Sequence, residues 1–397
     1  MNTKPNISFE NVEVAFASRS DAELKKMYLI FTAMNQKWAV ILGVAMARLA
    51  IKLKLPVKGL MKKTVFGHFC GGESIKDSAR SIKELADFGI GTILDYSVEG
   101  EGTERSYDFT RDEIRRTILR SAGAKEIPFT VFKATGLGDY KVMTKVQAGK
   151  ELNSKERDAF VRLKSRFDSL CKAAYENNVR ILVDGEESWF QDVIDDMTYD
   201  AMAKYNKDKA IVYNTYQMYR RDMLKNLKAA HHDAVAKGYY LGVKIVRGAY
   251  MEKEADRAED MGYPNPIHPT KKDTDDCFNK GLQFCVNNKQ RVYLVNGSHN
   301  DMSNIILTEL MGLHGVKPDD ERFYFAQLYG MGDHLSYNLA KAGYNVAKYV
   351  PYGPVEAVMP YLSRRAKENS SMSGHSSFEI ELIKKEMARR AAIKKEN

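Results

Sequence analysis

The stretch Val179–Asn214 reads VRILVDGEESWFQDVIDDMTYDAMAKYNKDKAIVYN, and it contains one complete strand–helix–strand pattern. The runs Val179–Asp184 and Ala210–Asn214 are short and rich in β-branched or aromatic residues, which is typical of buried strands. Between them, Trp189–Tyr205 is amphipathic and long enough to form a crossover helix. Because a helical crossover joins parallel strands, this stretch predicts a βαβ unit.

The same alternation continues on both sides of this stretch. A second long amphipathic segment, Ser154–Asn177, precedes it as another candidate helix. Six further candidate strands are Gly91–Tyr96, Pro128–Lys133, Leu241–Arg247, Arg291–Asn296, Arg322–Ala326 and Asn345–Val350. Eight parallel strands with helical crossovers predict an α/β fold of the distorted (β/α)8, TIM-like barrel type. An open doubly wound sheet is the alternative, but no strand leads into GxGxxG or GxxxxGK[ST].

The charge distribution predicts segments outside the barrel. The formal net charge is +9, and residues 1–63 carry eleven Lys/Arg against four Asp/Glu. We therefore expect a helical N-terminal arm over 1–63, the barrel over 64–375, and a basic helix or tail over 376–397. Such an arm suits an anionic membrane surface, or a cap whose lysines keep it soluble. Nucleic acid is the less favoured partner.

The composition also indicates a compartment. The cysteines Cys70, Cys171, Cys277 and Cys285 form no CxxC pair, so buried, reduced thiols in the cytoplasm are expected. The first twenty residues lack the features of a signal or transit peptide. The most apolar run, Trp38–Leu49, is too short to span a bilayer.

Polar side chains recur where the predicted strands end, which is where barrel enzymes place their sites. They are Asp95, Lys133, Asp184, Asn214, Lys244, Arg247, Asn296 and His299. Lys133 and Asp184 end neighbouring strands, so an ion pair is expected, either structural or bound to a charged substrate. Lys133 could equally act as a Schiff-base nucleophile, as in a class I aldolase. Without HExxH or a clustered triad, no catalytic metal and no Ser-His-Asp relay are expected.

Two further segments extend this prediction. The polar stretch Met251–Thr274 follows the fifth strand and contains three prolines, which favours a long functional loop, such as a lid. Near the C-terminus, Tyr361–Asn369 reads YLSRRAKEN. As a helix it places Tyr361, Arg364, Arg365 and Glu368 on one face. Paired guanidinium groups can grip a carboxylate or phosphate, whereas a solvated, salt-bridged face is the plainer interpretation.

Several segments, in order along 64–375, together resemble the proline dehydrogenase family. They read LDYSVEGE, VFKATG, LVDGEESW, YNTYQMY, VKIVRGAYM, GSHN, QLYGMGD and KYVPYGPVEAVMPYLSRRAKEN; they begin at residues 94, 131, 182, 213, 243, 297, 327 and 348. The last segment is the most specific. The resemblance implies a distorted (β/α)8 barrel whose pocket is covered by a C-terminal capping helix. It also implies a monofunctional enzyme that binds FAD, oxidises L-proline to Δ1-pyrroline-5-carboxylate and passes electrons to a membrane quinone.

The resemblance also implies roles for individual residues. The catalytic positions are Lys133, Asp184, Arg364 and Arg365, and these four bind substrate together with Tyr250, Tyr349 and Tyr361. FAD contacts are implied for Asn214, Gln217, Lys244, Val246, Arg247, Gly248, Ala249, His299, Asn300, Gln327 and Glu368. The two arginines would clamp the substrate carboxylate, and the tyrosines would pack around its ring.

Three expectations follow from the implied reaction. Tyr349 favours proline over hydroxyproline, because a large ring there would crowd a 4-hydroxyl group. A quinone-reducing enzyme must reach a bilayer, so the basic arm or tail would lie peripherally on the cytoplasmic face of an inner membrane, which in a eukaryote is the mitochondrial inner membrane. The product would pass to a separate pyrroline-5-carboxylate dehydrogenase, because the chain shows no second dehydrogenase domain.

Overall fold

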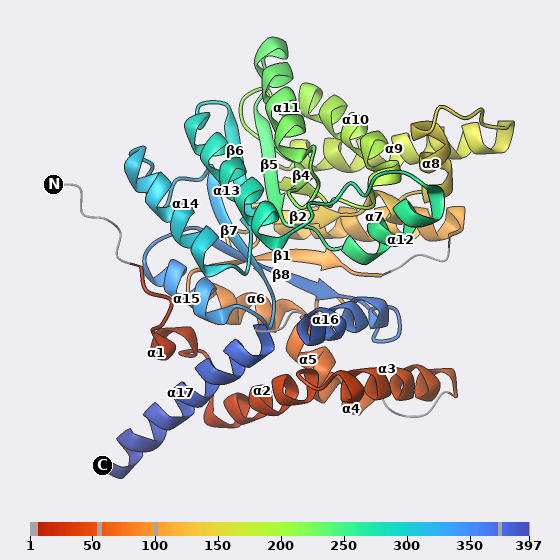
Figure 1. The fold of residues 1–397 in the computed structure, drawn as a ribbon. Coiled ribbons are helices and arrows are strands. Elements are labelled where there is room, and N and C mark those ends of the chain that lie inside the picture. Colours follow the sequence, from red (N-terminus) through yellow and green to blue (C-terminus); the bar gives the residue numbers. More distant parts are fainter. Residues whose placement is uncertain (1–6, 54–57, 99–101, 372–374, 397) are drawn as a thin grey trace. The chain divides into compact units, whose positions relative to one another are not determined.

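The computed structural model describes residues 7–53, 58–98, 102–371 and 375–396. Eight strands follow one another in sequence order around a closed barrel, which confirms the (β/α)8 prediction and rejects the open sheet (Figure 1). The strands are β1 Ile90–Tyr96, β2 Phe129–Phe132, β3 Arg180–Val183, β4 Val212–Gln217, β5 Leu241–Val246, β6 Val292–Gly297, β7 Phe323–Leu328 and β8 Val346–Tyr352.

All eight predicted strands exist, and the largest difference is in β4. Its predicted end was Asn214, but the strand continues to Gln217. The six residues of β4 are all buried although Thr215 and Gln217 are polar. A polar residue can be buried within a barrel strand, as Asn214 is beside Asp195 of the preceding helix, so the first polar residue does not mark the end of such a strand.

The chain divides into two compact units, and the first comprises Gly100–Ala326 and Gly343–Ala347, together with residues 1–6. Within it, β2 to β7 pair in parallel, with Phe132 opposite Val183 and Thr215 opposite Lys244. Its helices are α7 Glu104–Ser121, the 3-10 turn η1 Ala134–Gly136, α8 Tyr140–Gln147, α9 Ser154–Glu176, α10 Ser188–Tyr205, α11 Met223–Lys237, α12 Met251–Met261, α13 Lys271–Asn287 and α14 Asp301–Leu313.

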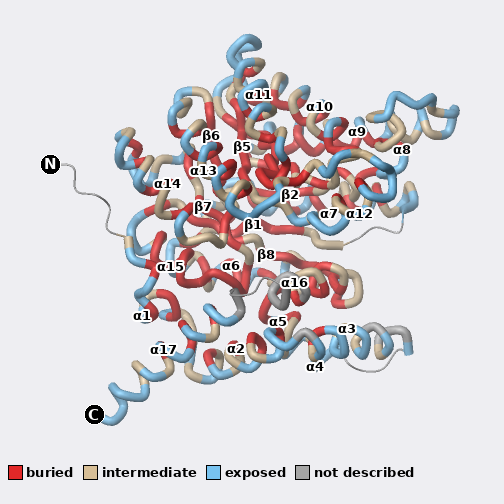
Figure 2. The backbone as a smooth tube through the Cα atoms, in the orientation of Figure 1, coloured by how far each residue is buried: buried red, intermediate tan, exposed pale blue. Residues whose placement is uncertain are grey.

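Helices α9 and α10 of the first unit confirm two predictions. Asn153 and Glu156 form a capping box at the start of α9, which confirms the helix predicted over Ser154–Asn177. Helix α10 confirms the one predicted over Trp189–Tyr205, and it buries Phe190, Ile194 and other apolar residues. The strands are mostly buried, and the fully exposed residues lie in helices and loops (Figure 2).

The prediction of a loop over Met251–Thr274 was wrong for much of its length. Residues Met251–Met261 form helix α12, which ends at Gly262 in the left-handed conformation. The charged residues that suggested a loop lie on the exposed face of this helix, while Glu254 and Ala258 are buried. Alternating charges along an amphipathic helix imitate the composition of a polar loop.

The second unit comprises Ile7–Glu99, Gln327–Ala342 and Lys348–Asn397. The residues that the structure describes in the predicted arm are mostly helical, as expected, although the proposed division at residues 63 and 375 stays a prediction. The helices of this unit are α1 Val12–Ala15, α2 Asp21–Met34, α3 Lys37–Lys52, α4 Lys58–Lys63, α5 Val65–Phe69, α6 Ala79–Ala86, α15 Asp333–Lys341, α16 Met359–Ser371 and α17 His375–Glu396.

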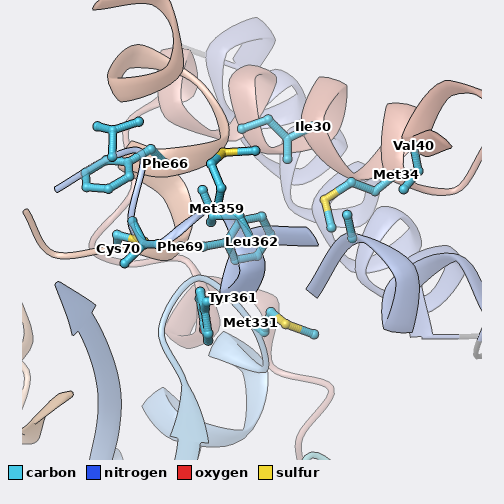
Figure 3. Packing of buried hydrophobic residues seen from close by; sticks show 13 residues of the cluster. Ile30, Met34, Val40, Phe66, Phe69, Cys70, Met331, Met359, Tyr361 and Leu362 are labelled. Carbon is cyan, nitrogen blue, oxygen red and sulfur yellow. The ribbon is translucent and has the colours of Figure 1, made fainter. Parts of the chain in front are cut away.

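Two apolar clusters hold the second unit together. In one, Phe16 and Phe31 pack with Leu382 and Ile383, so α17 packs on α1 and α2. In the other, Val40 of α3 belongs to the same core as Tyr361 and Leu362 of α16 (Figure 3). The N-terminal helices and α16 are therefore parts of one packed body.

A buried ion triad reinforces this unit. Asp333 at the start of α15 accepts a hydrogen bond of 2.6 Å from Lys348 Nζ in β8 and one of 3.2 Å from Arg19. The side chains of Lys348 and Asp333 are only 1% and 2% exposed. Burial opposes the charge on Asp333, but Lys348 and Arg19 outweigh it and hold its pKa well below the usual range. The triad ties the turn before α2 to the last barrel strand.

The length and apolarity of the helices bear on whether one of them could cross a membrane. Among the described residues, no single helix is long and apolar enough to cross a bilayer, whereas α2 with Trp38–Ala47 passes by length and composition only as a pair bent by 101°.

We predict that Asp333→Ala lowers the free energy of unfolding by about 3–5 kcal/mol, because it leaves the Lys348 ammonium buried without its counter-charge. Chemical denaturation of the purified variant measures this. Asp87→Ala is the matched control, since Asp87 is 54% exposed in its pair with Lys83 and should change stability by about 0.5 kcal/mol or less. Equal losses in the two variants would contradict the ranking.

Candidate active site

Two lysines share one carboxylate at the carboxyl ends of the strands in the first unit. Lys133 Nζ donates to Asp184 Oδ2 over 3.0 Å, which confirms the predicted ion pair, and Lys244 Nζ donates to Asp184 Oδ1. Strand register explains the meeting: Lys133 and Asp184 each follow the paired residues Phe132 and Val183. Lys244 reaches the carboxylate from β5, where it pairs with Thr215 of the intervening strand.

The cluster combines two ammonium groups with one carboxylate. The side chains of Lys244, Asp184 and Lys133 are 5%, 15% and 34% exposed, so the cluster opens toward solvent on the Lys133 side. Burial raises the pKa of Asp184, but Lys244 and Lys133 lower it by more, and the carboxyl stays ionised. Two ammonium groups and one carboxylate leave a formal charge of +1. Such a cluster favours an anionic partner and disfavours a third ammonium group.

A second buried carboxyl group, which was not predicted from the sequence, is hydrogen-bonded to the turn that follows Lys133. Glu186 is 3% exposed and accepts from the Thr135 backbone N–H over 3.0 Å and from Thr135 Oγ1 over 2.5 Å. Thr135 lies two residues after Lys133 in the chain. Burial raises the pKa of Glu186 to about 7, although the hydrogen bonds from Thr135 oppose this. The acidic run DGEES offered a signal, but its spacing does not say which carboxyl is buried.

Helix α10 continues this polar network toward β4. Gln191 Nε2 and Asn214 Nδ2 donate to Asp195 Oδ1 over 2.7 Å and 2.9 Å. Burial raises the pKa of Asp195 to about 7, and the hydrogen bonds from Asn214 and Gln191 oppose the shift. Asn214 also accepts from the Thr215 N–H, so its side chain is bound to α10 and to its own strand. Its predicted contact with FAD stays a prediction.

Arg247 occupies a polar pocket beyond the end of β5. It donates to Asp275 over 2.7 Å and to the hydroxyl groups of Ser298 and Ser303 over 2.9 Å each. Its guanidinium lies 4.3 Å from the ring centre of Phe278. Burial lowers the pKa of Arg247, and Asp275 opposes this. The arginine is thus oriented by protein groups from two following helices, which leaves its predicted flavin contact untested.

The turn after β5 has a local requirement for glycine. Gly248 has φ +136°, and a Cβ there would collide with the ring of Tyr219. This turn leads through Ala249 and the half-buried Tyr250 into α12. Two contacts anchor α12 to α10: Glu254 accepts from the Ser188 N–H over 2.7 Å, and Arg257 lies 4.6 Å over the ring of Trp189.

The remaining predicted positions of the first unit also lie at strand ends. Val246 ends β5, and Asn300 caps α14 by accepting from the Ser303 N–H over 2.9 Å. His299, between β6 and α14, is half-buried. Gln217 at the end of β4 is 2% exposed, and its Oε1 accepts no hydrogen bond from the described residues. A buried acceptor of this kind fits a ligand that brings an N–H group.

The second unit carries the predicted positions of α16, β7 and β8. Residues Tyr361, Arg364 and Arg365 lie in one helix, as predicted, and Arg365 is 5.5 Å from the ring centre of Tyr361. Tyr361 is buried, while both arginines are half-buried and neither is an exposed surface group. Tyr349 is half-buried in β8, and the buried Gln327 accepts from Ser336 over 2.8 Å. The Glu368 side chain lies outside the described residues.

Over residues 7–53, 58–98, 102–371 and 375–396, no group of three or more His, Cys, Asp or Glu side chains gathers in a way that could hold a metal ion. All four cysteines are buried and free, as predicted.

A closed parallel barrel with ionised side chains at consecutive strand ends has the arrangement of a (β/α)8-barrel enzyme. Residues 78–378 match the family model described as proline dehydrogenase. The chain therefore belongs to the proline dehydrogenase family, an oxidoreductase family of proline catabolism, which confirms the resemblance.

Individual relatives show how far the similarity extends. Proline dehydrogenase 1, mitochondrial, from Dictyostelium discoideum is 34% identical over 382 residues, which cover 85% of this chain and 67% of that protein. The protein of the same name from Drosophila melanogaster is 39% identical over 250 residues, or 60% of this chain and 37% of that one. The chain thus spans between about one third and two thirds of the length of these relatives.

A solved structure is similar at the level of the fold. Proline utilization A from Bdellovibrio bacteriovorus, inactivated by N-propargylglycine, matches with a TM-score of 0.71 and 19% identity. The match covers 91% of this chain and 38% of that one.

We predict that Asp184→Asn destabilises the protein at neutral pH, because Lys133 and Lys244 lose the charge they share. A carboxyl with a lowered pKa stabilises the fold above its unfolded pKa, and this contribution is lost as the pH falls through the folded value. The difference in melting temperature between wild type and Asp184→Asn should therefore narrow below pH 3.8. Asp168→Asn is the control, because Asp168 is 42% exposed in its pair with Lys204. A difference that stays constant with pH would contradict the prediction.

Proposed function

We propose that this chain is an FAD-dependent proline dehydrogenase that oxidises L-proline to Δ1-pyrroline-5-carboxylate. The observation that carries the proposal is the family match over residues 78–378, in a chain whose strand ends hold the Lys133–Asp184–Lys244 cluster. The reaction removes a hydride from the ring carbon next to nitrogen and a proton from the nitrogen. Both the binding of a small zwitterion and the loss of its amine proton depend on charge, which this cluster controls.

Arg364 and Arg365 bind the proline carboxylate in this proposal. Each guanidinium presents a planar fork that matches a carboxylate, and adjacent positions on α16 place the two forks together. Tyr361, from the same helix, is rigidly held in an apolar core and offers a ring surface to the pyrrolidine (Figure 3). Tyr349 and Tyr250 provide the other rings.

The Lys133–Asp184–Lys244 cluster disfavours the protonated form of the substrate amine. Its formal charge of +1 opposes a third ammonium group, and a hydride leaves more readily from a neutral amine. Within the cluster Asp184 is held ionised by both lysines, so it does not serve as a neutral acid.

The polar groups at the strand ends suit a flavin. Gln217 brings a buried amide acceptor, Arg247 a half-buried guanidinium, and Asn300 lies at the start of a helix, where phosphates bind well. Lys244, Val246, Gly248, Ala249, His299, Gln327, Asn214 and Glu368 complete the proposed contacts. When bound, FAD supplies the electron acceptor for the hydride, and the protein supplies orientation and electrostatics.

Two alternative activities are less well supported. A class I aldolase needs a neutral lysine as nucleophile, whereas the Lys133 ammonium donates to an ionised carboxylate. Hydroxyproline oxidation needs room for a 4-hydroxyl group, and the large ring of Tyr349 opposes it. We therefore propose proline as the substrate. In this proposal a separate pyrroline-5-carboxylate dehydrogenase consumes the product.

The electrons pass to a membrane quinone, and helix α3 is the part of the chain that suits a bilayer surface. Much of α3 is exposed (Figure 2), and its exposed residues include large apolar side chains, whereas Val40 is buried in the core. The exposed apolar residues are Trp38, Ile41, Leu42, Met46 and Leu49 of α3, and Leu53, which follows the helix. From Leu24 to Gly72 the sequence has nine Lys/Arg and no Asp or Glu. An apolar helix face within a cationic segment is typical of attachment to anionic lipid.

The names of two relatives bear on the proposed compartment of this protein. The names of the Drosophila and Dictyostelium relatives both include the word mitochondrial. This favours the mitochondrial inner membrane over the cytoplasmic face of a bacterial membrane as the proposed location.

We predict that the purified chain is yellow, shows a flavin absorbance spectrum and reduces a redox dye only with proline. Arg364→Ala or Arg365→Ala should raise the KM for proline by about 10–100-fold, because each removes charge-assisted hydrogen bonds worth about 1.5–3 kcal/mol. Steady-state kinetics measure this. The matched control is Arg80→Ala, an arginine that is 80% exposed. A colourless protein that gains a borohydride-trapped adduct on Lys133 would support the aldolase instead.

We predict that Ile41→Asn/Leu49→Asn weakens binding to anionic vesicles by at least about tenfold, since each change removes an apolar side chain that bilayer insertion would bury. Vesicle sedimentation at low salt measures the binding. Leu119→Asn/Leu313→Asn is the control, because these leucines are 53% and 73% exposed on other helices. If both double variants bind like the wild type, α3 is not the attachment surface; if the wild type stays in solution, the chain does not attach to anionic lipid.

A further inference from the structure

The Glu186 carboxyl group has no part in the proposed reaction, but it is hydrogen-bonded to the backbone and side chain of Thr135, close to Lys133. Glu186 lies in the short link between β3 and α10 and is 3% exposed. Its two oxygens accept from the backbone N–H and the hydroxyl of Thr135, over 3.0 Å and 2.5 Å. Thr135 is in the 3-10 turn that immediately follows Lys133. Glu186 therefore fixes the turn from which the Lys133 side chain extends.

Glu186 is itself held in place from the other side. Its backbone N–H donates to Gln191 Oε1 over 2.6 Å, and Gln191 also donates to Asp195 over 2.7 Å. Asp195 in turn accepts from Asn214 of β4 over 2.9 Å. The result is a continuous hydrogen-bonded chain from the turn after β2, through α10, to β4. Such a chain fixes each of its members more tightly than an isolated pair does.

We propose that Glu186 is a positioning residue: by clamping Thr135 it sets the Lys133 ammonium against Asp184, and through that lysine it controls how the substrate is held. This inference rests on the proposed function for its effect on proline, but the clamp itself concerns only residues of this chain. Glu186 acts through Lys133, so it contacts neither substrate nor cofactor in this proposal.

The protonation state of Glu186 should matter to the clamp. An ionised carboxylate forms charge-assisted hydrogen bonds with both Thr135 donors, whereas a protonated carboxyl forms only weaker, neutral hydrogen bonds with Thr135. The charged groups that face Glu186 are Lys133, which favours ionisation, and Glu187, which opposes it. Burial outweighs the hydrogen bonds and brings the pKa to about 7, so the clamp should tighten as the pH rises through neutrality.

Two variants separate charge from shape. Glu186→Gln keeps the length of the side chain and removes its charge, and Thr135→Val removes the hydroxyl donor. For Glu186→Gln we expect the KM for proline to rise by about tenfold, since one charge-assisted hydrogen bond becomes neutral. We expect kcat to change by less than about twofold, and the dependence of kcat/KM on pH near 7 to be lost. Thr135→Val should give a smaller rise in KM and keep the pH dependence.

A second measurement does not require activity. The rate at which an amine-reactive reagent labels Lys133, followed by mass spectrometry, should fall as the pH rises from 6 to 8 relative to that of the exposed Lys83. In Glu186→Gln this relative fall should disappear. The labelling test works whether or not proline is the substrate, so the failure of the proposed function and the failure of the clamp give different results.

The control is another buried carboxyl with the same type of contact. Glu254 is 0% exposed and accepts from the Ser188 N–H over 2.7 Å and from its hydroxyl over 2.5 Å. Glu254→Gln should lower the melting temperature without changing the labelling of Lys133 or its pH dependence. If Glu186→Gln behaves in the same way, with normal KM and normal labelling of Lys133, Glu186 is merely structural and the proposal is wrong.

Discussion

Asp184 balances two lysines at once, and the first unit is organised around that balance. An isolated carboxylate in so buried a place would be strongly disfavoured, and so would either lysine alone. The barrel makes the arrangement feasible, because parallel register brings the ends of β2 and β3 to the same level and places Lys244 two strands beyond β3, across β4. The closed sheet thus fixes where these charged groups meet, so their arrangement is a property of the fold as much as of the side chains.

The barrel could be predicted because its signal is local and repeated. Runs such as Val179–Asp184 and Ala210–Asn214 are each short, apolar and followed by an amphipathic helix. The Lys133–Asp184 pair could also be predicted, because both residues stand at strand ends and the strands are neighbours. Both inferences need only periodicity and the order of the strands. The ends of the strands were predicted less well where polar residues are buried, as Gln217 is at the end of β4.

The rest of the site depends on contacts between distant residues, which periodicity does not record. Lys244 shares Asp184 with Lys133 through a contact between residues 60 apart in the chain, and its expected flavin contact stays a prediction. Glu186 was not singled out, because neighbouring Glu187 has the same chemistry and only burial distinguishes them. Helix α12 was taken for a loop, because the residues that anchor it, Glu254 and Arg257, resemble surface charges in the sequence. In each case tertiary packing, and not local propensity, decides the role.

In the second unit, helix α3, which we propose for bilayer attachment, shares one apolar core with α16, which we propose for substrate binding. Helix α3 has two faces: its inner residue Val40 packs in the core that also contains Tyr361 and Leu362, and its outer residues Trp38 and Leu49 are exposed. Well-packed interiors resist deformation, so a load on one face of such a core is transmitted to its other members. A bilayer that holds the outer face of α3 would therefore restrict the freedom of α16, the helix that carries Arg364 and Arg365. Attachment to the bilayer and binding of the substrate would then both depend on one packed core, the buried cluster in Figure 3.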